Sequence, residues 1–157
     1  MRYLLTLAGF ILALGTFVSS SHASSFSDTV PMVRKGAATF YVHGDIGGYG
    51  NVEMMVDTGA GYTTINQATL AVLQKNGNAE YVKELTGILA DGSRLTVPVY
   101  RIKTLTLGNS CILHDVDAAV FPKRTRMLLG LTALEKAAPF VFSTNPPSLL
   151  LSNCTAS

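Results

Sequence analysis

The most informative stretch of the chain is Val56-Asp57-Thr58-Gly59-Ala60, which places a carboxylate, a hydroxyl and a glycine directly after an apolar run. The run covers residues 52–56 and predicts a strand that anchors the following loop, so that Asp57 is aimed from a rigid base. Thr58 offers a hydroxyl that can fix the loop backbone, and Gly59 lets another backbone approach closely. Because these residue types are also common in turns, the triplet alone favours an ordinary turn. The segments around it reverse this balance.

Three further features accompany the motif, in a fixed order along the chain. Two strands are predicted before it, the sequence Leu-Ala-Asp-Gly-Ser after it predicts a hairpin that turns at Asp-Gly, and Met-Leu-Leu-Gly near the end precedes a short helix. These features cover residues 37–46 and 51–56, joined by the glycine-rich turn 47–50, then residues 89–93, 127–130 and 131–136.

Together with these segments, Asp57-Thr58-Gly59-Ala60 resembles the active-site signature of the retropepsin-like aspartic proteases (clan AA), in which alanine follows the triplet. The resemblance covers roughly residues 39–151, and the bacterial exported, single-domain members look closer than the viral ones. It implies an all-β fold, mainly β with one or two short helices, built as a retropepsin-like acid protease barrel with one lobe per chain.

The resemblance also assigns roles to individual residues. Asp57 corresponds to the catalytic residue, and because the chain has one Asp-Thr-Gly, two chains of a homodimer would each supply one Asp57. Two carboxylates about 3 Å apart cannot both ionise cheaply, so they would share a proton, one acting as base and the other as acid. The resemblance implies that Thr58, Gly59, Ala60 and Gly130 support the catalytic loop. It also implies that Ala90, Asp91 and Gly92 form the substrate-binding flap.

Two pairs of residues depart from the pattern of the viral enzymes. Gly61-Tyr62 stand where viral enzymes carry two aspartates, and Leu131-Thr132 stand where they carry an arginine that helps to tie the dimer. We therefore expect another contact to hold the two chains together. The candidates are the N-terminal arm and the C-terminal segments 140–142 and 149–151.

The chain is predicted to have three parts. Residues 1–23, with an uncharged apolar run from Leu4 to Val18, are typical of a secretory signal peptide cleaved after Ala23, and less so of an uncleaved membrane anchor or tether. Residues 24–37 are polar and are interpreted as an arm or linker, and residues 38–152 as the protease domain. The protein is therefore expected to be exported, either periplasmic or secreted.

Inside the domain, a strand is expected over residues 63–65, followed by a helix over 67–75 that Asn66 caps. Alternating apolar and polar residues predict hairpin strands on both sides of the Asp91-Gly92 turn. These strands cover residues 81–89 and 94–103, and two more are expected over 104–107 and 112–121.

Composition excludes several other classes of protein. Loss of Arg2 with the leader reduces the formal charge from +2 to +1, and no basic run with interleaved aromatics suggests nucleic acid. His43 and His114 lack a ligand-like spacing, so neither a metal nor a cofactor is expected. Cys111 and Cys154 form either a disulfide, as is common in exported chains, or two buried or unpaired thiols.

Three functions remain open at this point. The first is an aspartic endopeptidase that hydrolyses peptide bonds with water activated between two Asp57 carboxylates. The second is a peptide-binding relative that does not cut, and the third is a membrane-tethered structural subunit in which Asp57 is only a turn residue. An intact Asp-Thr-Gly-Ala with an Asp-Gly flap favours the first, since a pure binder need not keep a charge pair at a dimer axis.

Overall fold

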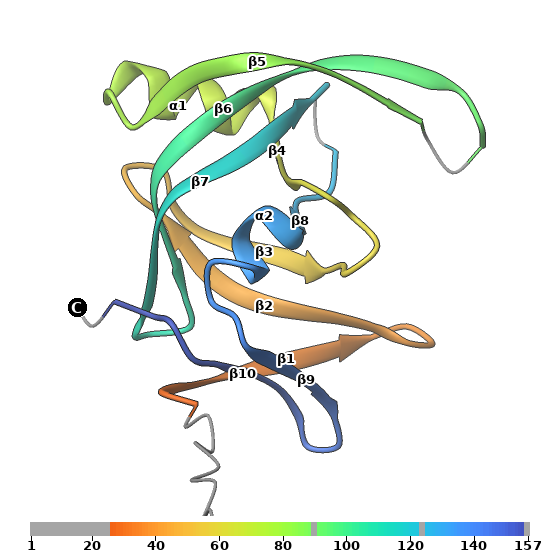
Figure 1. Ribbon diagram of the computed structural model, residues 1–157, viewed down its shortest axis with the longest axis vertical. Coiled ribbons are helices and arrows are strands. Elements are labelled where there is room, and N and C mark those ends of the chain that lie inside the picture. Colours follow the sequence, from red (N-terminus) through yellow and green to blue (C-terminus); the bar gives the residue numbers. More distant parts are fainter. Residues whose placement is uncertain (1–25, 89–90, 123–124, 156–157) are drawn as a thin grey trace, which may run out of the picture.

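A computed structural model of the chain describes residues 26–88, 91–122 and 125–155. This part of the chain is mainly β, as predicted, and its two helices are short (Figure 1). In chain order the elements are β1 (Asp28–Lys35), β2 (Thr39–Ile46), β3 (Gly50–Val56), β4 (Thr63–Asn66), α1 (Gln67–Lys75), β5 (Ala79–Ile88), β6 (Arg94–Leu107), β7 (Cys111–Phe121), β8 (Leu128–Leu129), α2 (Leu131–Leu134), β9 (Phe140–Thr144) and β10 (Pro147–Leu151).

The β2–β3 hairpin leads directly to Asp57. The two strands pair from Tyr41 opposite Met55 to Ile46 opposite Gly50. Val42 and Met54, which face each other in this register, are fully buried and belong to the main core. The turn needs glycine because Gly48 has φ +83° and Gly50 has φ +109°, a region that residues with a Cβ rarely occupy. The predicted hairpin is therefore confirmed.

Strands β5, β6 and β7 are antiparallel neighbours at one edge of a ten-stranded sheet, which continues from β7 to β4. The β5–β6 hairpin projects from the body on the side where β3 ends (Figure 1). Strand β6 is longer than predicted, since residues 94–103 and 104–107 form one continuous strand. Its last part, at residues 105–107, also pairs with β2, so β6 joins the projecting hairpin to the core sheet.

Helix α1 begins where the sequence predicts. The Asn66 side chain accepts a hydrogen bond of 3.0 Å from the amide of Thr69, which satisfies one of the free donors of the first turn. Leu70 and Leu73 lie on the buried face of the helix and pack into the core. Neither helix of the described segments has the length and hydropathy that a membrane span requires.

The interpretation of residues 24–37 as a polar arm or linker does not hold for residues 28–35. Residues 28–35 form β1, which pairs with β10 over its first half and with β2 over its second half. Val30 and Met32 are buried in the core. The signal for a strand is weak because Pro31 lies between these two residues and most of the other side chains face solvent.

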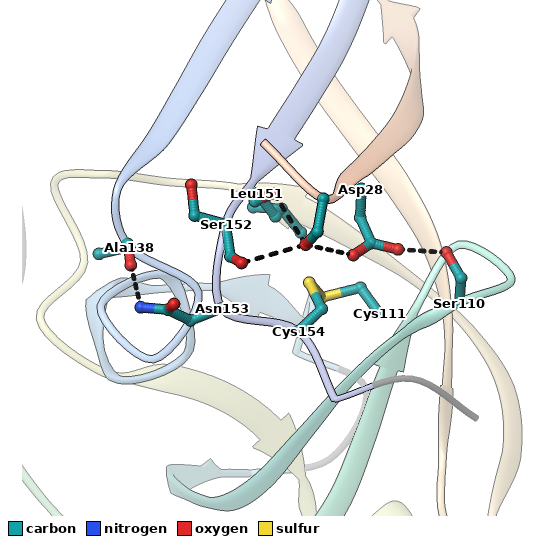
Figure 2. Close-up of a disulfide and its surroundings, with 9 residues drawn as sticks. Asp28, Ser110, Cys111, Ala138, Leu151, Ser152, Asn153 and Cys154 are labelled. Carbon is teal, nitrogen blue, oxygen red and sulfur yellow. Dashed lines mark hydrogen bonds between the residues drawn. A yellow bond between two sulfur atoms is a disulfide. The ribbon is translucent and has the colours of Figure 1, made fainter. Parts of the chain in front are cut away.

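A disulfide joins Cys111, the first residue of β7, to Cys154 in the C-terminal tail (Figure 2). The tail also forms two backbone hydrogen bonds with β7, between Ile112 and Thr155. Next to the disulfide, the hydroxyl of Ser110 donates a hydrogen bond of 2.5 Å to Asp28 at the start of β1. The tail, β1 and β7 are thereby held together at one end of the sheet.

Candidate active site

Asp57 follows the end of β3, where backbone hydrogen bonds join β3 to β8. The amide of Met55 donates to the carbonyl oxygen of Met127 at 3.0 Å, and the amide of Asp57 donates to that of Leu129 at 3.1 Å. These bonds continue the parallel pairing of β3 with β8. The Asp57 residue itself is half-buried. Its backbone therefore rests on a rigid pair of strands, while its carboxylate can still meet a ligand.

The loop that follows orients this carboxylate. The amide of Gly59 donates a hydrogen bond of 3.0 Å to Oδ1 of Asp57. The amide of Ala60 donates to the backbone carbonyl of the same aspartate at 3.2 Å. Thr58 and Gly59 are exposed. The tip of the loop is thus ordered by its own aspartate and is free to contact a second molecule.

Gly130 lies directly behind this loop. A Cβ at this position would be 2.8 Å from the carbonyl oxygen of Ala60 and closer still to the carbonyl group of Tyr62, both of them backbone atoms. The next residue, Leu131, donates its amide to the carbonyl of Ala60 at 2.9 Å. The amide of Gly130 itself donates to the buried hydroxyl of Thr63 at 3.3 Å. Only glycine allows the start of α2 to approach the loop this closely.

Asp57 lines a cavity of about 560 Å³ that lies between its own loop and the projecting hairpin. One wall comes from the loop and from β4 and β8, and the other from β5 and β7. Most of the lining is apolar. The lining residues are Asp57, Gly59, Ala60, Gly61, Tyr62, Thr64, Leu85, Gly87, Ile88, Ala119, Phe121 and Leu128.

The turn of the projecting hairpin contains two of the three residues assigned to the flap; Ala90 lies outside the described residues. Gly92 has φ +82°, as a tight Asp-Gly turn requires. Oδ1 of Asp91 accepts hydrogen bonds from the hydroxyl of Ser93 at 2.6 Å and from its amide at 2.9 Å. These bonds favour the ionised carboxylate and lower the pKa of Asp91 below its ordinary value.

Sequence reasoning located the aspartate, its loop and the turn, but not the wall of the cavity. Leu85 and Ile88 on β5 and Phe121 on β7 were not singled out, although Ile88 is 71% exposed, which is unusual for so large an apolar side chain. Also missed was the ion pair of Arg101 with Asp117, in which Nε donates at 2.8 Å and Nη2 at 3.1 Å. The alternation of apolar and polar residues in the hairpin strands was the available signal for these side chains. It does not indicate which face of the hairpin covers Asp57.

Comparison with known protein families agrees with the geometry of this site. A protein-family model described as "gag-polyprotein putative aspartyl protease" matches residues 42–136, which is more than half of the chain. The chain belongs to this family. The part of the chain that matches the aspartyl protease family begins in β2 and ends just after α2. It therefore contains the Asp57 loop, the projecting hairpin and Gly130.

A solved structure supports the same fold. The crystal structure of a retropepsin-like aspartic protease from Rickettsia conorii is similar to this chain, with a TM-score of 0.56 and 20% sequence identity. The similarity covers 78% of this chain and 98% of that one. No curated protein matches the chain significantly. The predicted retropepsin-like family and its single-lobe fold are therefore confirmed.

Within the described segments of this family member, no group of three or more His, Cys, Asp or Glu side chains is arranged to hold a metal ion. The site that the structure presents is instead one oriented carboxylate in a largely apolar cavity under a hairpin. Such a site suits chemistry in which carboxylates exchange protons with water and with a bound peptide.

Proposed function

We propose that the protein is an aspartic endopeptidase that works as a homodimer. One observation carries the proposal: the Asp57 carboxylate, held by Gly59, faces a cavity roofed by the β5–β6 hairpin. Because each chain has a single Asp-Thr-Gly, the acid and the base of peptide hydrolysis come from two copies of Asp57. The cavity and the hairpin support a polypeptide substrate bound in extended form between them.

The reaction needs one ionised and one protonated carboxylate, which two neighbouring carboxyl groups that share a proton provide. The ionised Asp57 takes a proton from water, whose oxygen then bonds to the peptide carbonyl carbon. The protonated Asp57 of the second chain donates its proton to the carbonyl oxygen. The Asp57 that took the proton from water then donates it to the amide nitrogen, and the C–N bond breaks. A hydroxyl of the tetrahedral intermediate returns its proton to the other Asp57, which leaves a carboxylic acid, an amine and a pair that again shares one proton.

The exposed tip of the Asp57 loop supports a contact between two chains, since Thr58 and Gly59 are available on the surface. A free N-terminal arm does not serve this purpose, because β1 pairs within its own chain. The outer edge of β9 is a better candidate. It is the last strand in the sheet order, carries no charged residue, and exposes Val141 to 41%. Such edges readily pair with another strand.

We also propose that the protein is exported. The apolar run from Leu4 to Val18 supports a signal peptide, and the Cys111–Cys154 disulfide supports an oxidising compartment. N-terminal sequencing of protein recovered outside the cytoplasm tests this. A chain that begins near Ser24 agrees with cleavage, whereas an intact N-terminus in the membrane fraction would mean a tether.

Incubation of the protein with a peptide library from pH 3 to 8 tests the activity. We expect the wild-type chain to cut and Asp57→Asn to lose about 10²-fold or more, since asparagine keeps the shape but cannot exchange the proton. Asp115→Asn is the matched control. Asp115 is exposed and has φ +55°, a conformation that asparagine tolerates well. Equal cleavage by wild type and Asp57→Asn would refute the proposal.

A further inference from the structure

The face of β5 that covers the cavity carries one cation. The register of β5 on β6 shifts at Tyr81/Lys83, where Val82 is left over as a bulge. After the bulge, Lys83 lies opposite Val99 and Leu85 lies opposite Val97. Leu85 lines the cavity, and Lys83, two residues earlier on the strand, points to the same face.

The side chain of Lys83 reaches the edge of the cavity. Its Nζ lies over the ring of Tyr62, 5.6 Å from the ring centre, and Tyr62 is itself a lining residue. Lys83 is exposed, so its ammonium group is open to solvent and to a bound ligand. The contact with Tyr62 raises the pKa of Lys83 above its ordinary value, so its ammonium group favours the charged form.

Lys83 makes no ion pair within the described part of the chain. The nearest row of charges is Glu80, Arg101 and Asp117, which lie opposite one another on β5, β6 and β7. There Arg101 holds Asp117 with two hydrogen bonds, so Asp117 acts on Lys83 only through space, as a small attraction that ranks below the contact with Tyr62. Glu84 is adjacent in sequence but lies on the opposite face of the strand.

We propose that Lys83 is a specificity-determining residue that favours peptides with a Glu or Asp side chain. The preference would act outside the two residues that flank the cut bond, because Lys83 lies beyond Leu85 and Tyr62 at the end of the cavity. This inference rests on the proposed function, and it names the class of substrate which that site selects.

The test uses pairs of fluorogenic peptides built on the sequence that wild-type protein cuts best. The members of each pair differ only by Glu or Gln at one position, two to four residues from the cut bond on either side. The ratio of kcat/KM for Glu over Gln is measured above pH 5, where a glutamate side chain is ionised. We expect the wild type to favour Glu about two- to five-fold at one position, which is the strength of an exposed ion pair.

Two variants assign the preference to Lys83. Lys83→Gln should abolish it and Lys83→Glu should reverse it. Lys75 is also exposed and lies at the end of α1, so Lys75→Glu should leave the preference unchanged. Added salt should weaken the wild-type preference because the pair is exposed. If wild type and Lys83→Glu give the same ratio at every position, the inference is overturned while the protease assignment stands.

Failure of the proposed protease function can be told apart from failure of the charge preference. If wild-type protein cuts none of the library, the proposed function fails. Fluorescence anisotropy then measures binding of Glu and Gln pairs that are built on the library peptide which wild-type protein binds most tightly. Tighter binding of the Glu peptides that is lost in Lys83→Glu would keep the charge preference for a non-cutting binder. Equal binding of both peptides would refute both ideas.

Discussion

The amide of Asp57 donates a hydrogen bond of 3.1 Å to the carbonyl oxygen of Leu129, so the aspartate is tied to a strand more than seventy residues further along the chain. The residue after Leu129 is Gly130, where the backbone of the loop leaves no room for a side chain. The position of the carboxylate therefore depends on a glycine that does not touch the cavity.

Gly130→Ala is expected to destabilise the fold by about 1–3 kcal/mol or more, because backbone atoms cannot move aside as a flexible side chain can. Gly61→Ala is the control in the same loop, since no atom lies within 4 Å of the added Cβ. Urea denaturation of both variants measures the difference. Equal midpoints would show that the contact behind the loop is not tight.

Mixing wild-type chains with Asp57→Asn chains tests whether the site spans two molecules. With equal amounts and random exchange, activity should fall to about half that of the same wild-type amount alone, because mixed dimers hold one working carboxylate. Specific activity should also drop on dilution below the dimer dissociation constant. A rate that does not change when the inactive chain is added, and that stays proportional to enzyme concentration, would place the whole site in one chain.

The activity should be bell-shaped in pH, with its maximum on the acidic side of neutral. A pair that shares one proton works only while that proton is present, so both limbs report the pair as a unit. Initial rates with one peptide from pH 3 to 9 give the profile. A flat profile between pH 4 and 9 would count against a carboxylate pair.

The Asp91-Gly92 turn should keep its hydrogen bonds from Ser93 in mild acid. Because the hydrogen bonds from Ser93 lower the pKa of Asp91, the stabilisation that they give is complete above the ordinary aspartate pKa and is lost only as pH falls through the lowered one. Ser93→Ala removes the hydroxyl bond and should raise the pKa of Asp91 toward its ordinary value. A carboxyl ¹³C titration of both proteins measures this, and identical curves would contradict it.

Removal of the disulfide by Cys111→Ala with Cys154→Ala should destabilise the protein by roughly 4 kcal/mol in the chain-entropy model, given the sequence separation of 43 between the two cysteines. Guanidinium denaturation of the double variant against the oxidised wild type gives the value. Mass measurement of unreduced protein that shows two alkylatable thiols would mean that the bridge is absent in solution.

Local patterns in the sequence predicted much of the fold. The β2–β3 hairpin, the capped helix at Asn66 and the long β5–β6 hairpin all follow from neighbours in the chain, and each is present close to the expected bounds. Asp57 and the Asp91-Gly92 turn could be named for the same reason, because each motif is short and continuous.

The remaining features depend on contacts between distant segments. Nothing near Met55 indicates that it lies parallel to Leu128, and nothing near Pro31 indicates that a strand there will pair with β10. The bulge at Val82, which turns Lys83 toward Tyr62, is likewise fixed by pairing with β6. A linear pattern does not determine register, and a shift of one residue reverses the face of every side chain that follows.

The pairing of β1 with both β2 and β10 sets a limit on how far the N-terminus can be trimmed. Proteolysis before Ser27 would spare both ladders of β1. A cut after Met32 would withdraw Val30 and Met32 from the core and leave β10 without one of its two neighbours. Digestion by a protease that works inward from the N-terminus should therefore stop ahead of Asp28, where the folded chain itself resists further cleavage.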